Sequence, residues 1–500
     1  MKYTSHLKQL SLDTFCSSFD DLDKNNRWVK LGDLLPWTEL EKVYNSCVDE
    51  AQSAAGNKLA CIIIGVCIIK HKFSRSDKET VSMIQKNPYI QYLHCLSNFT
   101  DKSLFDQSLF TTIRKRIAIE EINRFTTELF NKGLASKEAC QIEKQKCKDD
   151  NEELPITCTG DNGVGFMDSQ KRTHKGVLKI NATCDDAEVR YPVAVDIIHN
   201  GYKIADRYIR KIYKWLHIKN IRSFYCDACS FYIELIKRKK KETILIRSTT
   251  SAMLNHMKKV LRKLVELFVE FRSSQDILQP HEQCILRTTF GMCSQQSEMF
   301  EEKKHQCKDR ILCIFQPHVP SIVRSKSETP TEFGEKAGVV ANEEYTFIEH
   351  YSGNTCNENS KFLLQIQSFK ERFGHVPATI LADKIYISKA YKTILKEYEI
   401  KAYCKPLDRL TKKIKSSEYI EKIGEVVEER NEVECSFGLG KRIYRASNIR
   451  AKFPETVGCW TGMCYFVKSM MKVLRGLRLA IFEFWLNLWI DTIANIGLQL

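Results

Sequence analysis

Long apolar runs are missing from this chain of 500 residues, and we expect no secretory leader in its first residues. The two most apolar stretches are Cys61–Ile69, which is short, and Leu479–Leu500, which Glu483 and Asp491 interrupt. Because a spanning helix needs about 18 to 20 apolar residues, we expect no membrane segment. Met1–Phe15 mixes polar and charged residues without an apolar core, unlike a secretory signal. We therefore expect a cytoplasmic protein.

Proline and glycine are scarce, with 11 and 21 residues, whereas 43% of the residues are hydrophobic and 28% are charged. This composition excludes a disordered or collagen-like chain, because it allows a large core to be buried. At about 150 residues per domain, the length predicts about three domains, or one large domain with appendages.

A second Cys-x-x-Cys pair is also missing. Cys226 and Cys229 form the one such motif among 20 cysteines, and without a partner pair a structural zinc site is disfavoured, although metal binding there stays open. Most other cysteines, such as Cys61 and Cys464, lie in apolar surroundings, where a reduced thiol behaves as a small hydrophobe.

Positive charge is in excess, with 77 Lys and Arg against 62 Asp and Glu, a net charge of +15. Such an excess favours a polyanionic partner, above all nucleic acid. A short helix ending in Arg114, Lys115 and Arg116 resembles a DNA-recognition helix, but a solvated basic helix end is an equal alternative. The run Lys237–Lys241 could likewise follow a phosphate backbone or form a solvated face.

The N-terminal third has helical patterns. Thr38-x-x-Glu41 and Ser76-x-x-Glu79 read as capping boxes, and Leu59–Lys70 is a largely apolar helical segment between them. These signals predict a compact helical domain.

Strand patterns follow a polar, acidic linker. Val177–Cys184 and Glu188–Pro192 read as strands, whereas Ala205–Arg272 has helical spacing and interrupts the sheet. The later part alternates strands and helices. The strands are expected at Arg310–Phe315, Glu335–Ala341, Tyr345–His350, 376–383 and Ile400–Cys404, and the helices at Ser360–Arg372 and Ser388–Glu397.

Asp383 ends an apolar strand. A carboxylate in that position is typical of the sheet edge where open α/β sheets place their chemistry, and the alternative is that Asp383 caps the next helix.

The segment 428–442 carries charges of both signs. At about 100° per residue, Arg430, Glu434 and Lys441 fall on one helical stripe. Such a stripe fits either a solvated surface of ion pairs or a site that binds a metal and phosphates. The solvated-surface interpretation does not predict Gly438 and Gly440, each of which costs about 1 kcal/mol in a helix interior, unless another backbone comes close or the helix loosens there. In a site, Glu434 would hold a divalent metal while Arg430 and Lys441 hold substrate phosphates.

The order of these motifs resembles bacterial insertion-sequence transposases of the DDE type. The resemblance rests on Leu178–Cys184, Leu381–Tyr386 and the Arg-x3-Glu-x6-Lys spacing of 430–441, with further similar segments at Phe315–Arg324 and Thr331–Lys336. It implies an RNase H-like catalytic domain, in which three carboxylates hold two Mg²⁺ (or Mn²⁺) ions.

By motif position, Asp383 is the second carboxylate and Glu434 the third. The family's first carboxylate is Asn181 here, and Tyr191–Ala194 departs from the usual Tyr-Pro-Thr-Asp. A neutral amide cannot bridge two cations, so we hypothesise that this copy is inactive or impaired. Asp185 or Asp186 is a poor substitute, because four residues along a strand is about 13 Å.

The expected fold is α+β or α/β. We expect a helical DNA-binding domain at 1–140, a linker at 141–170, an RNase H-like domain at 171–455 with a helical insertion at about 200–275, and C-terminal helices at 456–500.

The leading function is a nucleoid-associated DDE transposase that cuts and joins insertion-sequence DNA ends as a homo-oligomer with Mg²⁺. The alternatives are a non-catalytic DNA-binding protein derived from such an enzyme and a metal-dependent repair nuclease. Neither the DNA sequence recognised nor the number of subunits follows from the sequence.

Overall fold

The computed structural model describes most of the chain. The described residues are 18–47, 59–146, 166–189, 193–218, 225–240, 242–271, 277–304, 307–323, 331–342, 345–352, 358–403, 431 and 433–497. The chain divides into two compact units. Unit 1 comprises 1–185, 336–352 and 356–500, and unit 2 comprises 186–335 and 353–355.

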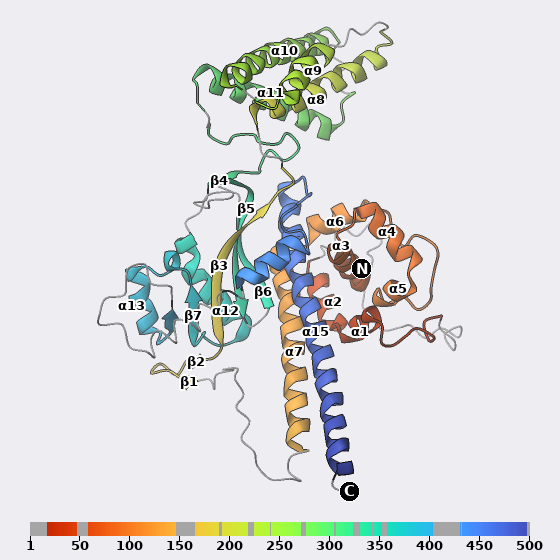
Figure 1. Cartoon of the computed structure of the whole chain (residues 1–500), viewed down its shortest axis with the longest axis vertical. Helices are drawn as coiled ribbons and strands as arrows, with labels where there is room; N and C mark the ends of the chain where they lie inside the picture. The colour runs from red at the N-terminus through yellow and green to blue at the C-terminus, as the bar shows by residue number, and fades with distance from the viewer. Residues whose placement is uncertain are drawn as a thin grey trace. The chain divides into compact units, whose positions relative to one another are not determined.

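Helices make up the first part of unit 1 (Figure 1). They are α1 (Arg27–Leu34), α2 (Trp37–Ser46), α3 (Ala60–Phe73), α4 (Asp77–Lys86), α5 (Pro88–Leu93), α6 (Leu109–Arg116) and α7 (Ile119–Lys146). Helix α3 is apolar on every side and its residues from Ala60 to His71 are all buried, so it forms the centre of this group.

One of the two predicted capping boxes is present. The Ser76 hydroxyl accepts a hydrogen bond from the Glu79 backbone, and the Glu79 carboxylate accepts one from the Ser76 backbone at the start of α4. The prediction for Thr38 is wrong, because α2 begins one residue earlier, at Trp37 after Pro36. The Trp37 indole donates to the Gly32 carbonyl at 2.8 Å and so fixes this earlier start.

A mixed sheet follows, and the fold class is α+β. Its strands are β3 (Val177–Asp186), β4 (Ser321–Val323), β5 (Thr331–Asn342), β6 (Tyr345–Ser352), β7 (Thr379–Ala382) and β8 (Lys401–Tyr403). The order is β4-β5-β3-β7-β8, and β6 pairs with β5. Strands β3, β7 and β8 are parallel to one another, whereas the β5–β6 pair is antiparallel.

Helices α12 (Phe362–Phe373) and α13 (Lys389–Glu397) supply residues to a core with the central strands. Leu178 and Ile180 of β3 lie in this core together with Phe369 of α12. Because side chains alternate along a strand, Asn181 and Asp185 belong to the opposite face of β3. A small hairpin of β1 (Phe166–Met167) and β2 (Thr173–His174) precedes β3.

Two predicted strands differ from the structure. Strand β3 already ends at Asp186, so Glu188 lies outside it, and 190–192 lie outside the described residues. Residues 310–315 are irregular, with a bend at Leu312 and a turn at 314–315, because the Gln295 side chain hydrogen-bonds the Ile311 N–H at 2.9 Å and the Asp309 carbonyl at 3.0 Å. These bonds replace the pairing that a strand would supply.

Unit 2 is built mainly from helices. They are α8 (Ala194–Trp215), α9 (Tyr225–Lys237), α10 (Thr243–Glu270) and α11 (Pro280–Glu301). The unit has its own apolar core, to which α8, α10 and α11 contribute buried residues such as Tyr202, Met257 and Met292. The predicted insertion at about 200–275 lies within this unit.

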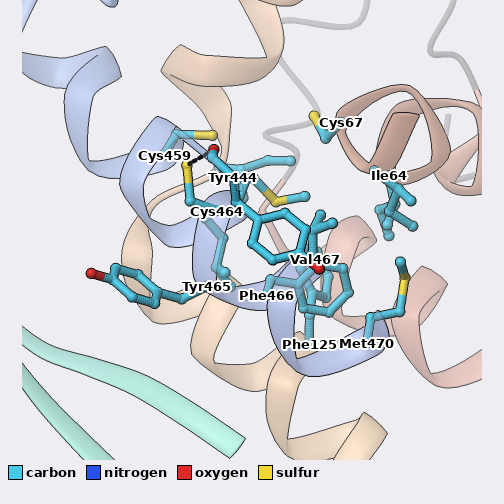
Figure 2. Close-up of a cluster of buried hydrophobic side chains, with 14 of the residues drawn as sticks. Ile64, Cys67, Phe125, Tyr444, Cys459, Cys464, Tyr465, Phe466, Val467 and Met470 are labelled. Atoms are coloured by element: carbon cyan, nitrogen blue, oxygen red, sulfur yellow. Dashed lines mark hydrogen bonds between the residues drawn. The ribbon is translucent and has the colours of Figure 1, made fainter. Parts of the chain in front are cut away.

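One long helix, α15 (Pro454–Gly497), lies side by side with α7 (Figure 1). Every residue from Cys459 to Met471 is buried. Phe466 packs against Phe125 of α7, and the Cys464 thiol contacts the Tyr444 carbonyl at 3.0 Å (Figure 2). None of the described helices is long and apolar enough to cross a membrane.

The first testable prediction concerns Gly438 and Gly440, which lie in the helix 433–442. A Cβ at Gly440 would lie 2.7 Å from a Tyr465 ring carbon, whereas one at Gly438 would meet the flexible end of Arg442 at 2.9 Å. We expect Gly440→Ala to lower the free energy of unfolding by about 1 to 3 kcal/mol, because the buried ring cannot move away.

Gly438→Ala is the matched control. It adds the same methyl group two residues away and is expected to be neutral or to stabilise by up to about 1 kcal/mol, because alanine favours the helix. Urea unfolding of both variants measures the difference, and equal stabilities would contradict the close approach at Gly440.

Candidate active site on the sheet

Two of the three predicted carboxylate positions belong to neighbouring parallel strands: Asn181 lies on β3, and Asp383 directly follows β7. The register pairs Ile180 of β3 with Ala382 of β7, so Asn181 and Asp383 each follow one step later. Asn181 is half-buried and Asp383 is exposed. The structure thus brings together residues that are 202 positions apart in the chain.

Asp383 does not cap the next α-helix, α13. The N-cap of α13 is Ser388, whose hydroxyl accepts a hydrogen bond from the Tyr391 N–H at 3.3 Å. Asp383 instead precedes a single 3-10 turn, Lys384–Tyr386, labelled η5.

Asn181 differs chemically from the carboxylate that the resemblance implies. Its side-chain oxygen accepts a hydrogen bond from the Ala182 N–H at 2.8 Å, so one of its lone pairs is used locally. A carboxylate would offer a second oxygen and a negative charge, and the amide offers neither.

Glu434 and Lys441 lie seven residues apart on the helix 433–442, and therefore on the same side of it. Glu434 is exposed and Lys441 is half-buried, while Val433, Phe437 and Gly440 form the buried side. The third member of the predicted stripe, Arg430, lies outside the described residues.

A buried lysine holds this helix in place. Lys468 of α15 donates hydrogen bonds to the hydroxyls of Ser436 and of Thr346, the latter at 2.8 Å, and the two hydroxyls lie 3.3 Å apart. One ammonium group therefore connects α15, β6 and the helix that carries Glu434. No pattern in the sequence predicts this contact, because Lys468 stands there as an interruption of an apolar helix.

Asp185 lies four residues beyond Asn181 on the same strand. Its carboxylate is fully buried and accepts a hydrogen bond from the Tyr465 hydroxyl at 3.1 Å. Burial and the neighbouring carboxylate together hold the pKa of the Tyr465 phenol well above its usual range, so this hydroxyl keeps its proton. Asp185 therefore joins β3 to α15, which fits the expectation that it does not replace Asn181.

The donor set does not fit a pair of divalent cations. Among the described residues there is no group of three or more His, Cys, Asp or Glu side chains placed to hold a metal ion. Asp383 and Glu434 are the two carboxylates that remain of the predicted set, and two cations usually need more oxygen ligands and more negative charge. We therefore derive no metal-dependent step from these residues.

The predicted recognition helix corresponds to α6. The Arg114 guanidinium pairs with Asp77 at 2.7 Å and lies 5.1 Å from the Trp460 ring centre, so it is used within the fold. Lys115 is half exposed and lies 3.7 Å from Glu455. Arg116 is half-buried and its side chain hydrogen-bonds Tyr44. Lys115 is thus the most accessible cation of the three.

In unit 2, Lys237, Arg238, Lys239 and Lys240 of the second basic run are exposed. Cys229 is half-buried, whereas the side chain of Cys226 lies outside the described residues, so metal binding by this pair stays open.

Comparison with known proteins gives one match. Residues 17–116 match the family model described as "Transposase domain (DUF772)". No curated protein and no solved structure matches the chain. The matched segment covers α1 to α6, and it marks the chain as transposase-like.

The second testable prediction concerns the hydrogen bond between Tyr465 and Asp185. Tyr465→Phe removes one donor from a buried carboxylate, and we expect a loss of about 1 to 3 kcal/mol in the free energy of unfolding. Tyr398→Phe is the control, because Tyr398 is exposed and its ring lies under Arg172. Urea unfolding distinguishes them, and an equally small effect of both changes would show that the hydrogen bond contributes little.

Proposed function

We propose that this protein is a DDE-type transposase derivative, which binds double-stranded DNA ends and has impaired metal-dependent cleavage. The transposase-like match of residues 17–116 and the net charge of +15 support DNA as the partner. The impaired cleavage rests on one observation: the position beside Asp383 on the central strand pair is Asn181.

The sheet supports an RNase H-like catalytic domain. In such a domain, carboxylates from a central strand, a second strand and a helix converge on the metal ions, as the sequence resemblance implies. Here β3 carries Asn181, its parallel neighbour β7 leads to Asp383, and the helix 433–442 carries Glu434. The order of strands, with an antiparallel β5–β6 hairpin beside β3, fits this arrangement.

The amide at position 181 separates two functions that a transposase combines. DNA binding depends on basic groups such as Lys115 and Lys441, and an amide at 181 leaves these unchanged. Cleavage depends on cations that neutralise charge at the scissile phosphate, for which an Asn181 carbonyl oxygen is a weak ligand. A non-catalytic DNA-binding protein of transposase origin is therefore the second candidate.

The third testable prediction is a gain of function. Asn181→Asp restores the missing carboxylate, and we expect it to raise the rate of strand cleavage at least about tenfold, which corresponds to about 1.4 kcal/mol in the activation barrier. The assay uses labelled duplexes that carry the DNA ends flanking the reading frame, with Mg²⁺ or Mn²⁺.

Asn181→Asp combined with Asp383→Asn is the control, and it should abolish the gain. Efficient cleavage by the unmodified chain would refute the proposed impairment. If Asn181→Asp gains nothing although duplex binding is intact, the change at position 181 is not the only lesion, and the non-catalytic candidate is favoured.

A further inference from the structure

A small basic pocket that opens to solvent lies in unit 1 at the end of α3. Its wall consists of residues from α3 and the turn after it, the segment 444–450, and α15. The residues that matter here are Ser74, Arg75, Arg445, Asn448, Arg450 and Trp460. The described lining contains no Asp or Glu, so we call it the basic pocket.

Trp460, which lines the basic pocket, carries a buried hydrogen-bond donor. Its side chain is 7% exposed, and its indole N–H has no hydrogen-bond partner among the described residues. An indole N–H donates and cannot accept, and a buried donor is usually satisfied. Two cations lie over the ring, Lys70 at 5.0 Å and the Arg114 guanidinium at 5.1 Å from its centre. These groups favour a negatively charged hydrogen-bond acceptor beside the Trp460 indole.

Not all of the surrounding cations are available. Lys70 and Arg114 both bind the Asp77 carboxylate, which offsets their charge. By contrast, the guanidinium groups of Arg75 and Arg445 form no hydrogen bond or ion pair within the described part of the chain. Arg75 is near enough to Glu79 to help lower the pKa of that carboxyl, after the hydrogen bonds from Ser76. Among the described residues, Arg445 has no comparable acidic neighbour.

The backbone at Arg445 is unusual as well. Its φ is 63°, in the left-handed region that favours glycine, just after the end of the helix 433–442. An arginine in this position is less favourable for the backbone than a glycine. Arg445 thus combines an unfavourable backbone conformation with a guanidinium that has no partner among the described residues. This combination points to a role in binding a ligand rather than in stabilising the fold.

We propose that the basic pocket binds a phosphate group, with Arg75 and Arg445 pairing its oxygens and the Trp460 indole donating a hydrogen bond. Guanidinium groups match phosphate oxygens in geometry and charge. Asn448 can add a donor, because a half-turn of its buried amide exchanges oxygen and nitrogen. The phosphate is either a phosphodiester of the DNA backbone, which rests on the proposed function, or a free phosphate.

The fourth testable prediction uses Arg445→Gly. Glycine adopts the observed φ without strain, so the variant is expected to fold. Lys171→Gly is the matched control, because exposed Lys171 also has a positive φ of 59°, lies in the β1–β2 turn and loses the same charge. We expect Arg445→Gly to weaken binding of a random-sequence duplex about tenfold relative to Lys171→Gly, and to lower the salt slope by about one.

A second arm uses inorganic phosphate alone. At equal ionic strength, phosphate should raise the Tm of the unmodified chain and of Lys171→Gly, and it should do so much less for Arg445→Gly and Trp460→Phe. Trp460→Phe keeps an aromatic ring and removes only the N–H donor. Unchanged duplex affinity in Arg445→Gly, together with no phosphate effect on the Tm of the unmodified chain, would overturn the proposal.

The two arms distinguish the sources of the phosphate. A phosphate-dependent Tm with unchanged duplex affinity supports a free phosphate and excludes the DNA backbone as the ligand. If the unmodified chain binds no duplex at all, the proposed function fails, and the Tm measurements still decide whether the basic pocket holds phosphate.

Discussion

The structure of unit 1 depends on the burial of one helix from all sides. Between Cys459 and Met471, α15 exposes no residue, although this stretch contains Lys468 and several hydroxyl groups. A helix without a polar face needs neighbours all round, because each apolar side chain left in water forfeits about 1.5 to 3 kcal/mol. Helices α3 and α7 cover part of α15, and β3 and β6 supply further contacts.

Polar contacts determine how α15 is aligned along the helices and strands that surround it. Tyr465 donates to Asp185 of β3, Lys468 donates to Thr346 of β6, and the Cys464 thiol lies 3.3 Å from the ring nitrogen of His71 in α3. A buried polar group left unpaired costs about 1 to 3 kcal/mol, so a shift of α15 by one residue would be penalised at several points together. The transposase-like segment and the sheet are in this way parts of one core.

The candidate active site and the basic pocket both depend on residues of α15 in this core. Lys468 positions the helix that bears Glu434, while Trp460 of the same α15 forms part of the basic pocket. Lys468 and Trp460 both lie on α15, which the sequence predicts only as an apolar helical segment packed in the core. A chain that had lost cleavage would still need this core, because removing it would expose α3 and the sheet together.

The sequence determined the local features of this protein and the pattern of its motifs. Strand β7 before Asp383, the two strands β5 and β6, helix α12 and the Ser76 capping box are confirmed, because each depends on side-chain periodicity or on groups within a few residues. That Asn181 replaces a catalytic carboxylate stays a prediction of the sequence resemblance. The Thr38 box and the strand at 310–315 were wrong, because Trp37 and Gln295 compete through contacts that periodicity does not contain.

Only the tertiary structure decided which distant residues meet. Asn181 is placed beside Asp383 by the parallel register of two strands, and Arg75, Arg445 and Trp460 surround one pocket although 385 positions separate the first from the last. It also decided that Arg114 is used inside the fold, while the Arg445 guanidinium has no partner within the described part of the chain. Charge is visible in a sequence, but whether an opposite charge compensates it depends on packing between elements far apart in the chain.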